Sequence, residues 1–186
     1  MGKLIYSMAT SLDGYAVDAD GKYDWSEPDE ETHAFFNEYV QGIGTYLYGR
    51  RMYQEMVYWE TVDQETGLPE VAYGFGRRWR AADKIVYSTT LDEVSSAKTT
   101  LERSFDPDAV RRLKATSEQD MTIEGPTLAV HALRAGIVDE IHQFLSPVIV
   151  GGGISFYPDD LRIDLELFDE RRFASGVVMV QYRVRD

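Results

Sequence analysis

The stretch from Thr122 to Gly153 carries the residues whose types and spacing point most directly to chemistry. Gly125-Pro126-Thr127-Leu128 follows a short apolar segment and opens an amphipathic run that ends at Gly136. This order predicts a strand, a tight turn and a helix that begins on Thr127. Free backbone N–H groups at a helix N-terminus are a favourable place for phosphate or pyrophosphate. The turn therefore predicts a nucleotide-type ligand, with a simple threonine-capped turn as the alternative.

Three consecutive glycines close the same stretch. Gly151, Gly152 and Gly153 follow an apolar run that ends at Val150. Glycine lets the backbone approach a ligand or another strand closely, and it also adopts the positive φ of a strand-end turn. The sequence leaves these three explanations open.

Arginine and hydroxyl side chains follow two other predicted strands. Gly49-Arg50-Arg51-Met52 ends one strand and enters a helix. Two guanidinium groups there can clamp a phosphate, or they can form ordinary surface salt bridges. Ser88 and Thr89 end the next strand. Their hydroxyls can donate hydrogen bonds to a phosphate or a ribose, or they can simply cap a local turn.

Acidic residues near the first predicted strand are candidates for moving a proton. Asp13 and Gly14 follow this strand directly, at the position where ligands bind in open α/β sheets. Glu30 opens the next predicted helix, where a carboxyl partly buried beside Trp25 can have a raised pKa and pass a proton. His33 lies one turn later and is placed to hydrogen-bond a substrate. The simpler explanations are a turn pair, a favourable helix dipole and a surface histidine.

Composition excludes several classes of protein. The chain has 186 residues, 44% of them hydrophobic, which suits one domain spanning residues 1–186. The net charge of −13 argues against nucleic-acid partners and against anionic membranes. No cysteine and only three histidines are present, so we expect no metal site. No apolar segment resembles a leader or a membrane span, and we expect a cytoplasmic protein.

Strands and helices must alternate to position these residues. Strands are expected at 3–10, 45–48, 84–88, 101–104, 121–124, 140–150, 165–172 and 177–185. Helices are expected at 29–41, 50–56, 72–82, 106–116 and 127–135. This alternation predicts a mostly parallel sheet covered on both faces, with an antiparallel hairpin at its C-terminal edge. Turns rich in Gly, Ser, Thr and Arg would then meet at one sheet edge and form a long cleft for a dinucleotide. No Gly-x-Gly-x-x-Gly or P-loop motif is present, which disfavours a Rossmann module or a P-loop NTPase.

The ordered set of motifs resembles the dihydrofolate reductase superfamily. More closely, it is similar to the C-terminal reductase domain of the bacterial riboflavin-biosynthesis deaminase/reductase and its stand-alone relatives. The similarity covers nearly the whole chain and rests on Ser11-Leu12-Asp13-Gly14, Tyr48-Gly49-Arg50-Arg51-Met52-Tyr53, 84–91, 125–128 with 135–140, and 147–153. It implies a three-layer α/β/α fold with a mixed, mostly parallel central sheet and a C-terminal antiparallel hairpin.

The resemblance also implies a cofactor and its contacts. The family is known for NADPH-dependent reduction, with Ala9 and Thr10 beside the nicotinamide. Trp25, Pro28 and Glu30 can be laid over the Trp, Pro and acidic proton donor of dihydrofolate reductases. The other implied cofactor contacts lie at strand ends: Gly14, Gly49, Arg50, Arg51, Met52, Ser88, Thr89, Gly125, Pro126, Thr127 and Leu128.

The chain departs from the family pattern beside the Gly-Pro turn. The riboflavin enzymes carry a substrate-binding Glu at the position of Ile123, whereas this chain has Glu124 one step later. Because side chains alternate along a strand, Glu124 is expected to face away from a substrate. Thr89 stands where related chains often place an arginine.

Together these features predict a reductase that uses NADPH. Its substrate would be a pyrimidine, a pterin or a similar polar heterocycle, including 5-amino-6-(5-phosphoribosylamino)uracil, with Glu30 or Asp13 as proton donor and Trp25 and His33 as substrate contacts. Two alternatives are a non-catalytic nucleotide-binding or regulatory module on the same fold, and a reductase that uses a flavin or deazaflavin. By resemblance to the family, we expect a homodimer.

Overall fold

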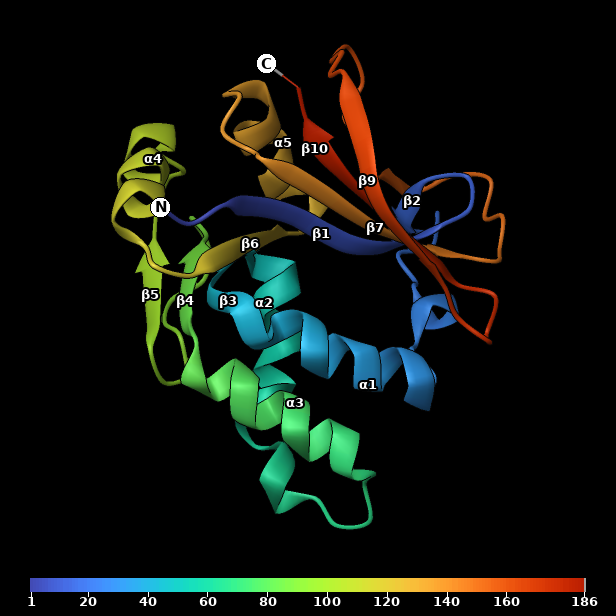
Figure 1. Ribbon diagram of the computed structural model, residues 1–186. Helices are drawn as coiled ribbons and strands as arrows, with labels where there is room; N and C mark the ends of the chain where they lie inside the picture. Colours follow the sequence, from blue (N-terminus) through green and yellow to red (C-terminus); the bar gives the residue numbers. More distant parts are fainter. Residues whose placement is uncertain (186) are drawn as a thin grey trace.

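An eight-stranded sheet forms the centre of the computed structural model, which describes residues 1–185 (Figure 1). The strand order is β5-β4-β3-β6-β1-β7-β10-β9. The strands are β1 (Leu4–Ser11), β3 (Ile43–Gly49), β4 (Asp83–Tyr87), β5 (Thr99–Glu102), β6 (Asp120–Glu124), β7 (Glu140–Ser146), β9 (Leu165–Arg172) and β10 (Val178–Val184). The first six in this order are mutually parallel, and β10 pairs antiparallel with both β7 and β9. The predicted mixed, mostly parallel sheet with a C-terminal hairpin is therefore confirmed.

Helices cover both faces of the sheet, as Figure 1 shows. One face carries α1 (Glu30–Tyr39), α2 (Arg50–Met56) and α3 (Glu70–Ala81), and the other carries α4 (Pro107–Thr116) and α5 (Pro126–Arg134). Four 3₁₀ segments, at 24–26, 40–42, 57–60 and 62–64, connect them. No helix among residues 1–185 is long and apolar enough to cross a membrane.

The two faces of the sheet bury separate hydrophobic clusters. On the α5 face, Leu4, Tyr6, Leu47 and Ile123 pack against both helices of that side. On the α1 face, Ile5, Tyr46, Tyr48 and Val86 pack against α1, α2 and α3. Strand residues thus alternate between faces, and this alternation decides which side chains reach the site.

Two helices begin on the caps that the sequence indicates. The carboxylate of Asp29 accepts a hydrogen bond from the Thr32 amide at 2.9 Å and starts α1 one residue later than predicted. Asp106 accepts from the Asp108 amide at 2.9 Å, with Pro107 in the first turn of α4.

Several boundaries shift by one to four residues from the sequence predictions, and one short strand was not predicted. Strand β7 ends at Ser146 instead of Val150, because Pro147 has no N–H to continue the ladder. Helix α5 begins at Pro126, one residue before Thr127, since proline suits the first helical position. Residues Tyr15–Val17, for which no strand is predicted, form strand β2, which pairs with β8 (Ile154–Ser155) in a separate two-stranded sheet.

Candidate functional site

The carboxyl ends of six parallel strands meet at one edge of the sheet, and two central strands lose contact there. Paired positions between β1 and β6 end with Tyr6 and Ile123, although β1 continues to Ser11. Beyond Tyr6, β1 pairs with β7 alone. The backbone of β1 on the β6 side is thus left without a strand partner, next to the start of α5.

The N-termini of α2 and α5 lie side by side at this edge. A Cβ placed on Gly49 would lie 3.7 Å from the Cβ of Leu128, and one on Gly125 would lie 3.7 Å from the Cβ of Met52. Neither helix has a side-chain cap at its N-terminus. Gly125 has φ +94°, which other residues adopt only with strain, and it turns the chain from β6 into α5. In the first turn of α5, Pro126 has no N–H and the Leu128 amide donates to the Gly125 carbonyl at 3.2 Å, which leaves the Thr127 amide for a ligand. Two helix N-termini therefore meet at one place that suits a diphosphate.

Cationic and hydroxyl groups line the same edge farther from β1. Arg50 and Arg51 are exposed, and neither forms an ion pair within residues 1–185. Ser88 is buried, and its hydroxyl accepts hydrogen bonds from the amides of Thr90 and Leu91 at 3.2 and 2.9 Å, so it already serves the local turn. Thr89 is exposed.

A cation that the sequence analysis did not single out stands at the Ser88 turn. The guanidinium group of Arg103 donates to the carbonyl oxygens of Ser88 and Leu91 at 3.1 and 2.6 Å. These bonds fix the positive charge of Arg103 beside Thr89. A side chain just after β5 thus brings a cation close to Thr89.

Glu124, at the end of β6, brings a carboxyl group to the α1 face of the site. It pairs in register with Tyr48 and shares a face with Thr122, whose hydroxyl donates to it at 2.9 Å. Burial raises the pKa of Glu124 to about 7, and the Thr122 hydrogen bond only partly offsets this effect. Ile123, by contrast, is fully buried on the α5 face. Glu124 is therefore a half-buried carboxyl that can hold or release a proton near neutral pH.

Asp13 binds the loop that follows β7. Its carboxylate accepts from the amides of Val150 and Gly151 at 3.2 and 2.8 Å. A hydrogen bond from the Ser11 side chain, followed by these two amides, lowers the pKa of this exposed carboxyl. Gly14 has φ +86° in the turn between β1 and β2. These contacts make Asp13 an ionised anchor for the glycine loop.

Gly153 in this loop needs to be glycine because another strand is close. A Cβ at this position would collide with the carbonyl oxygen of Val17 in β2, whereas one at Gly152 would meet open space. Two of the explanations left open by the sequence apply to Gly153, since it lies against a strand and also has φ +131°.

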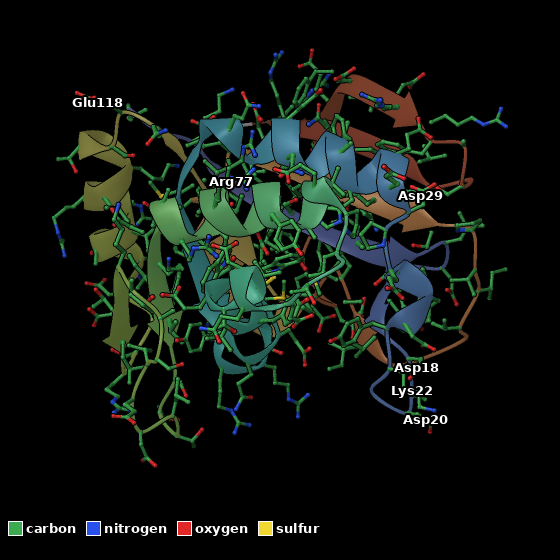
Figure 2. All side chains as sticks on the ribbon, turned by 90° about the horizontal axis from the view of Figure 1, so that it is seen from below. Asp18, Asp20, Lys22, Asp29, Arg77 and Glu118 are labelled. Atoms are coloured by element: carbon green, nitrogen blue, oxygen red, sulfur yellow. The ribbon has the colours of Figure 1, made fainter. Side chains whose placement is uncertain are left out.

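Trp25, Glu30 and His33 were predicted to donate a proton or contact a substrate. They lie in different surroundings near the start of α1. Glu30 is the exposed first residue of α1. Trp25 is half-buried, and its indole N–H has no hydrogen-bond partner within the described chain. His33 is half-buried with its ring 5.7 Å from Trp59 and 5.9 Å from Phe75, and burial lowers its pKa. Figure 2, which looks onto the α1 and α3 side, shows Asp29 at the beginning of α1, next to Glu30 in the chain.

The two residues predicted beside the nicotinamide point to opposite faces of β1. Ala9 is half-buried on the α1 face, against the cluster of Phe144, Phe173 and Met179. Thr10 is fully buried, and its hydroxyl accepts from the Gln143 amide at 2.9 Å. Ala9 thus lies on the open stretch of β1, while Thr10 contributes its side chain to the interior.

The fold is dihydrofolate-reductase-like. Dihydrofolate reductase from Enterococcus faecalis, solved with NADP(H), superposes with a TM-score of 0.62 at 15% identity, covering 100% of this chain and 98% of that one. Residues 2–179 match the family described as the RibD C-terminal domain, and the chain belongs to this family.

Two solved structures and one sequence relative agree with this assignment. A putative riboflavin biosynthesis protein from Shewanella matches with a TM-score of 0.74 and 21% identity over 100% of both chains. A diaminohydroxyphosphoribosylaminopyrimidine deaminase/5-amino-6-(5-phosphoribosylamino)uracil reductase from Thermotoga maritima matches with a TM-score of 0.67 and 15% identity, over 99% of this chain and 57% of that one. The Bacillus subtilis protein YyaP is 26% identical over 97% of this chain and 94% of its own length.

Proposed function

We propose that the protein is an NADPH-dependent reductase of the RibD type that acts on a pyrimidine, a pterin or a similar polar heterocycle. The observation that carries the proposal is the end of β6. There a half-buried carboxyl with a pKa of about 7 directly precedes an uncapped helix N-terminus, beside the open part of β1. A proton source and a diphosphate site are thus next to each other in a family of reductase domains.

The residues present fit the cofactor. The adjacent N-termini of α2 and α5 would hold the pyrophosphate, and Arg50 with Arg51 would approach the phosphates. Thr89 and Arg103 would border the adenosine ribose and its 2′-phosphate. Ala9 would lie beside the nicotinamide, where the unpartnered backbone of β1 can pair with a carboxamide. When bound, the cofactor supplies the hydride.

Glu124 is the best candidate for supplying the proton that accompanies the hydride. Its raised pKa keeps a large fraction of the carboxyl protonated at neutral pH, which a general acid requires. Glu30 is exposed, and Asp13 is held as a carboxylate by its amide contacts. We therefore propose that Glu124 donates the proton to the substrate. Glu30 and Asp13 are proposed to lie at the entrance to the substrate site. Trp25, with its free indole N–H, is proposed to contact the substrate.

The substrate class follows from the family and stays a proposal. The Thermotoga maritima neighbour is described as a 5-amino-6-(5-phosphoribosylamino)uracil reductase. That compound is therefore the first substrate to test in a panel of heterocycles. The partly buried rings around α1 suit a planar heterocycle, and a protonated Glu124 can donate to its carbonyl or imine group.

Cofactor titration tests the proposal. NADPH should quench tryptophan emission, and Arg50→Ala with Arg51→Ala should weaken binding at least several-fold. Arg77→Ala with Arg111→Ala removes the same charge from pairs on α3 and α4 and is the matched control. Figure 2 shows Arg77 on α3.

Three outcomes separate the candidate functions. NADPH oxidation with a member of the heterocycle panel supports the reductase. NADPH binding without oxidation of the panel supports a non-catalytic module. Binding of FMN or a deazaflavin in place of NADPH identifies a different cofactor, and the absence of all binding at millimolar concentration contradicts the proposal.

A further inference from the structure

Three neighbouring strands end in the same register at the edge of the sheet where the diphosphate is proposed to bind. Gly49 of β3 pairs with Tyr87 of β4, and Tyr87 pairs with Glu102 of β5. The next residues along the three strands are Arg50, Ser88 and Arg103. Because neighbouring strands lie about 4.8 Å apart, the backbones at the two arginines are about 10 Å apart, on either side of the turn that begins at Ser88.

Backbone carbonyl groups of the turn after β4 hold the side chain of Arg103. Its Nη1 donates to the carbonyl oxygens of Ser88 and Leu91 at 3.1 and 2.6 Å, and its Nη2 donates to the carbonyl oxygen of Asp92 at 3.3 Å. A long side chain that is already held in one place loses less conformational entropy when it binds a ligand. Arg103 is therefore a preorganised cation.

The charge of Arg103 is not neutralised by a carboxylate. The side chain is exposed and forms no ion pair within residues 1–185, and its three partners are neutral carbonyl groups. A guanidinium group has five N–H donors, so the three bonds leave N–H groups on Nε and Nη2 for a further acceptor. Free donors on a charged planar group are well suited to phosphate oxygens.

The carboxylate that precedes Arg103 in the chain belongs to another cluster. Glu102 pairs in register with Tyr87, which packs on the α5 face of the sheet. Burial, and then the charges of Glu102 and Asp106, raise the pKa of Tyr87 to about 12. These two carboxylates thus lie close to the phenol of Tyr87, which leaves the free donors of Arg103 to a ligand.

Neutral hydroxyl groups lie between the two arginines. The Ser88 hydroxyl accepts hydrogen bonds from two backbone amides of its turn, whereas Thr89 and Thr90 are exposed. The order along this edge is therefore a cation at Arg50, a turn with exposed hydroxyls, and a cation at Arg103. A ribose with one phosphate toward each arginine matches this order of groups.

We propose that Arg103 selects a nucleotide that carries a second phosphate, on the 2′ oxygen of its adenosine ribose, and so makes the protein prefer NADPH to NADH. This inference rests on the proposed function, which places the diphosphate at the N-termini of α2 and α5 beside Arg50. The 2′-phosphate accepts hydrogen bonds from the free N–H groups of Arg103, while the carbonyls of the turn hold the guanidinium in place. NADH has no group that can make this contact, so the contact discriminates between the two cofactors.

A comparison of NADPH with NADH tests this role. In Arg103→Gln the amide can still donate to a carbonyl of the turn, but the charge is lost. We expect the Kd for NADPH to rise by about tenfold or more, because charge-assisted hydrogen bonds are lost, and the Kd for NADH to stay nearly unchanged. Calorimetric titration of both cofactors at one ionic strength measures the ratio of the two Kd values.

Lys98→Gln is the matched control. Lys98 precedes the other end of β5, and its ammonium group also donates to a backbone carbonyl, that of Ala81 at 2.7 Å. The substitution removes the same charge and should leave the ratio of the two Kd values as it is in the wild type. If Arg103 only stabilised its turn, Arg103→Gln would weaken both cofactors by the same factor. Such equal weakening, or the absence of any preference for NADPH in the wild type, would overturn the proposal.

Nucleotides without a nicotinamide show whether a failure lies here or in the proposed function. The wild type should bind 2′,5′-ADP about tenfold or more tightly than 5′-AMP, and Arg103→Gln should remove this difference. If this holds but NADPH is not oxidised with any heterocycle, the reductase fails and the role of Arg103 stands. If 2′,5′-ADP binds no better than 5′-AMP, or less tightly than 3′,5′-ADP, the role of Arg103 fails even when NADPH is oxidised.

Discussion

At the scale of single residues, the titration of Glu124 links the proposed proton transfer to the stability of the fold. Its ordinary pKa of 4.5 is raised to about 7 by burial in the folded protein. A carboxyl with a raised folded-state pKa contributes most to stability below its unfolded value, and this contribution is lost as the pH rises from about 4.5 through about 7. Glutamine has a similar shape and stays neutral, so it does not share this loss.

We therefore expect Glu124→Gln to gain stability relative to the wild type as the pH rises. The difference between the two free energies of unfolding should be larger at pH 8 than at pH 5 by about 1 to 3 kcal/mol. Urea unfolding at both pH values measures it, with Glu118→Gln on the surface as control. The same substitution should abolish most reductase activity, while NADPH binding remains. An equal stability difference at both pH values would contradict the raised pKa.

Sequence reasoning found the residues at the strand ends but not the direction of every side chain. Gly49, Gly125, Arg50 and Arg51 were recognisable because their types are unusual next to strands. The expectation that Glu124 faces the side of the sheet opposite to position 123 is confirmed, whereas the side on which a substrate lies stays a prediction. The structure shows Glu124 and Ile123 on opposite faces, with the carboxyl on the α1 side. A strand's face depends on its register and on the turn that follows, which one sequence does not contain.

At the scale of elements, the β6–α5 turn depends on backbone conformation and not on side-chain volume. Gly125→Ala places a Cβ at φ +94°, although its nearest neighbour would be at 3.7 Å. We expect it to cost about 1 to 2 kcal/mol of stability and to weaken NADPH binding. Gly49→Ala is the control, because Gly49 has φ −75° and a similar contact distance. Chemical unfolding should show Gly49→Ala near the wild type, and equal losses in both variants would refute the conformational explanation.

The glycine loop combines the two requirements, because Gly153 has φ +131° and its backbone also lies against β2. Gly153→Ala would push β8 away from β2, so it should be strongly destabilising locally, whereas Gly152→Ala should be tolerated. Hydrogen exchange at the amides of β2 and β8 measures this directly. Loss of protection in both variants, or in neither, would show that close approach to β2 is not the reason for Gly153. The three glycines are visible in the sequence, but their partner strand β2 is only three residues long and was not predicted.

At the scale of the whole molecule, the fold was predictable because its signals repeat along the chain. Strands and helices alternate, so each parallel strand brings its loop to the same sheet edge, and small errors in boundaries do not change the topology. The hydrogen bond between Tyr39 and His142 was not predictable, since the two residues come from distant elements and neither is unusual in its local sequence. The homodimer stays a prediction that light scattering can check.

The net charge of −13 gives a global test of the cofactor site. The overall field repels an anionic dinucleotide, so binding depends on local groups, chiefly Arg50, Arg51 and the two helix N-termini. At about 100 times its Kd, NADPH should stabilise the fold by about 2.7 kcal/mol, which raises the Tm of a chain of this size by about 5 to 10 °C. If Arg50→Ala with Arg51→Ala weakens binding about tenfold, the double variant should keep about half of this shift at the same concentration. Arg77→Ala with Arg111→Ala makes the net charge equally more negative and should keep the full shift. Equal losses in the two double variants would mean that overall charge, and not the cluster at the sheet edge, governs binding.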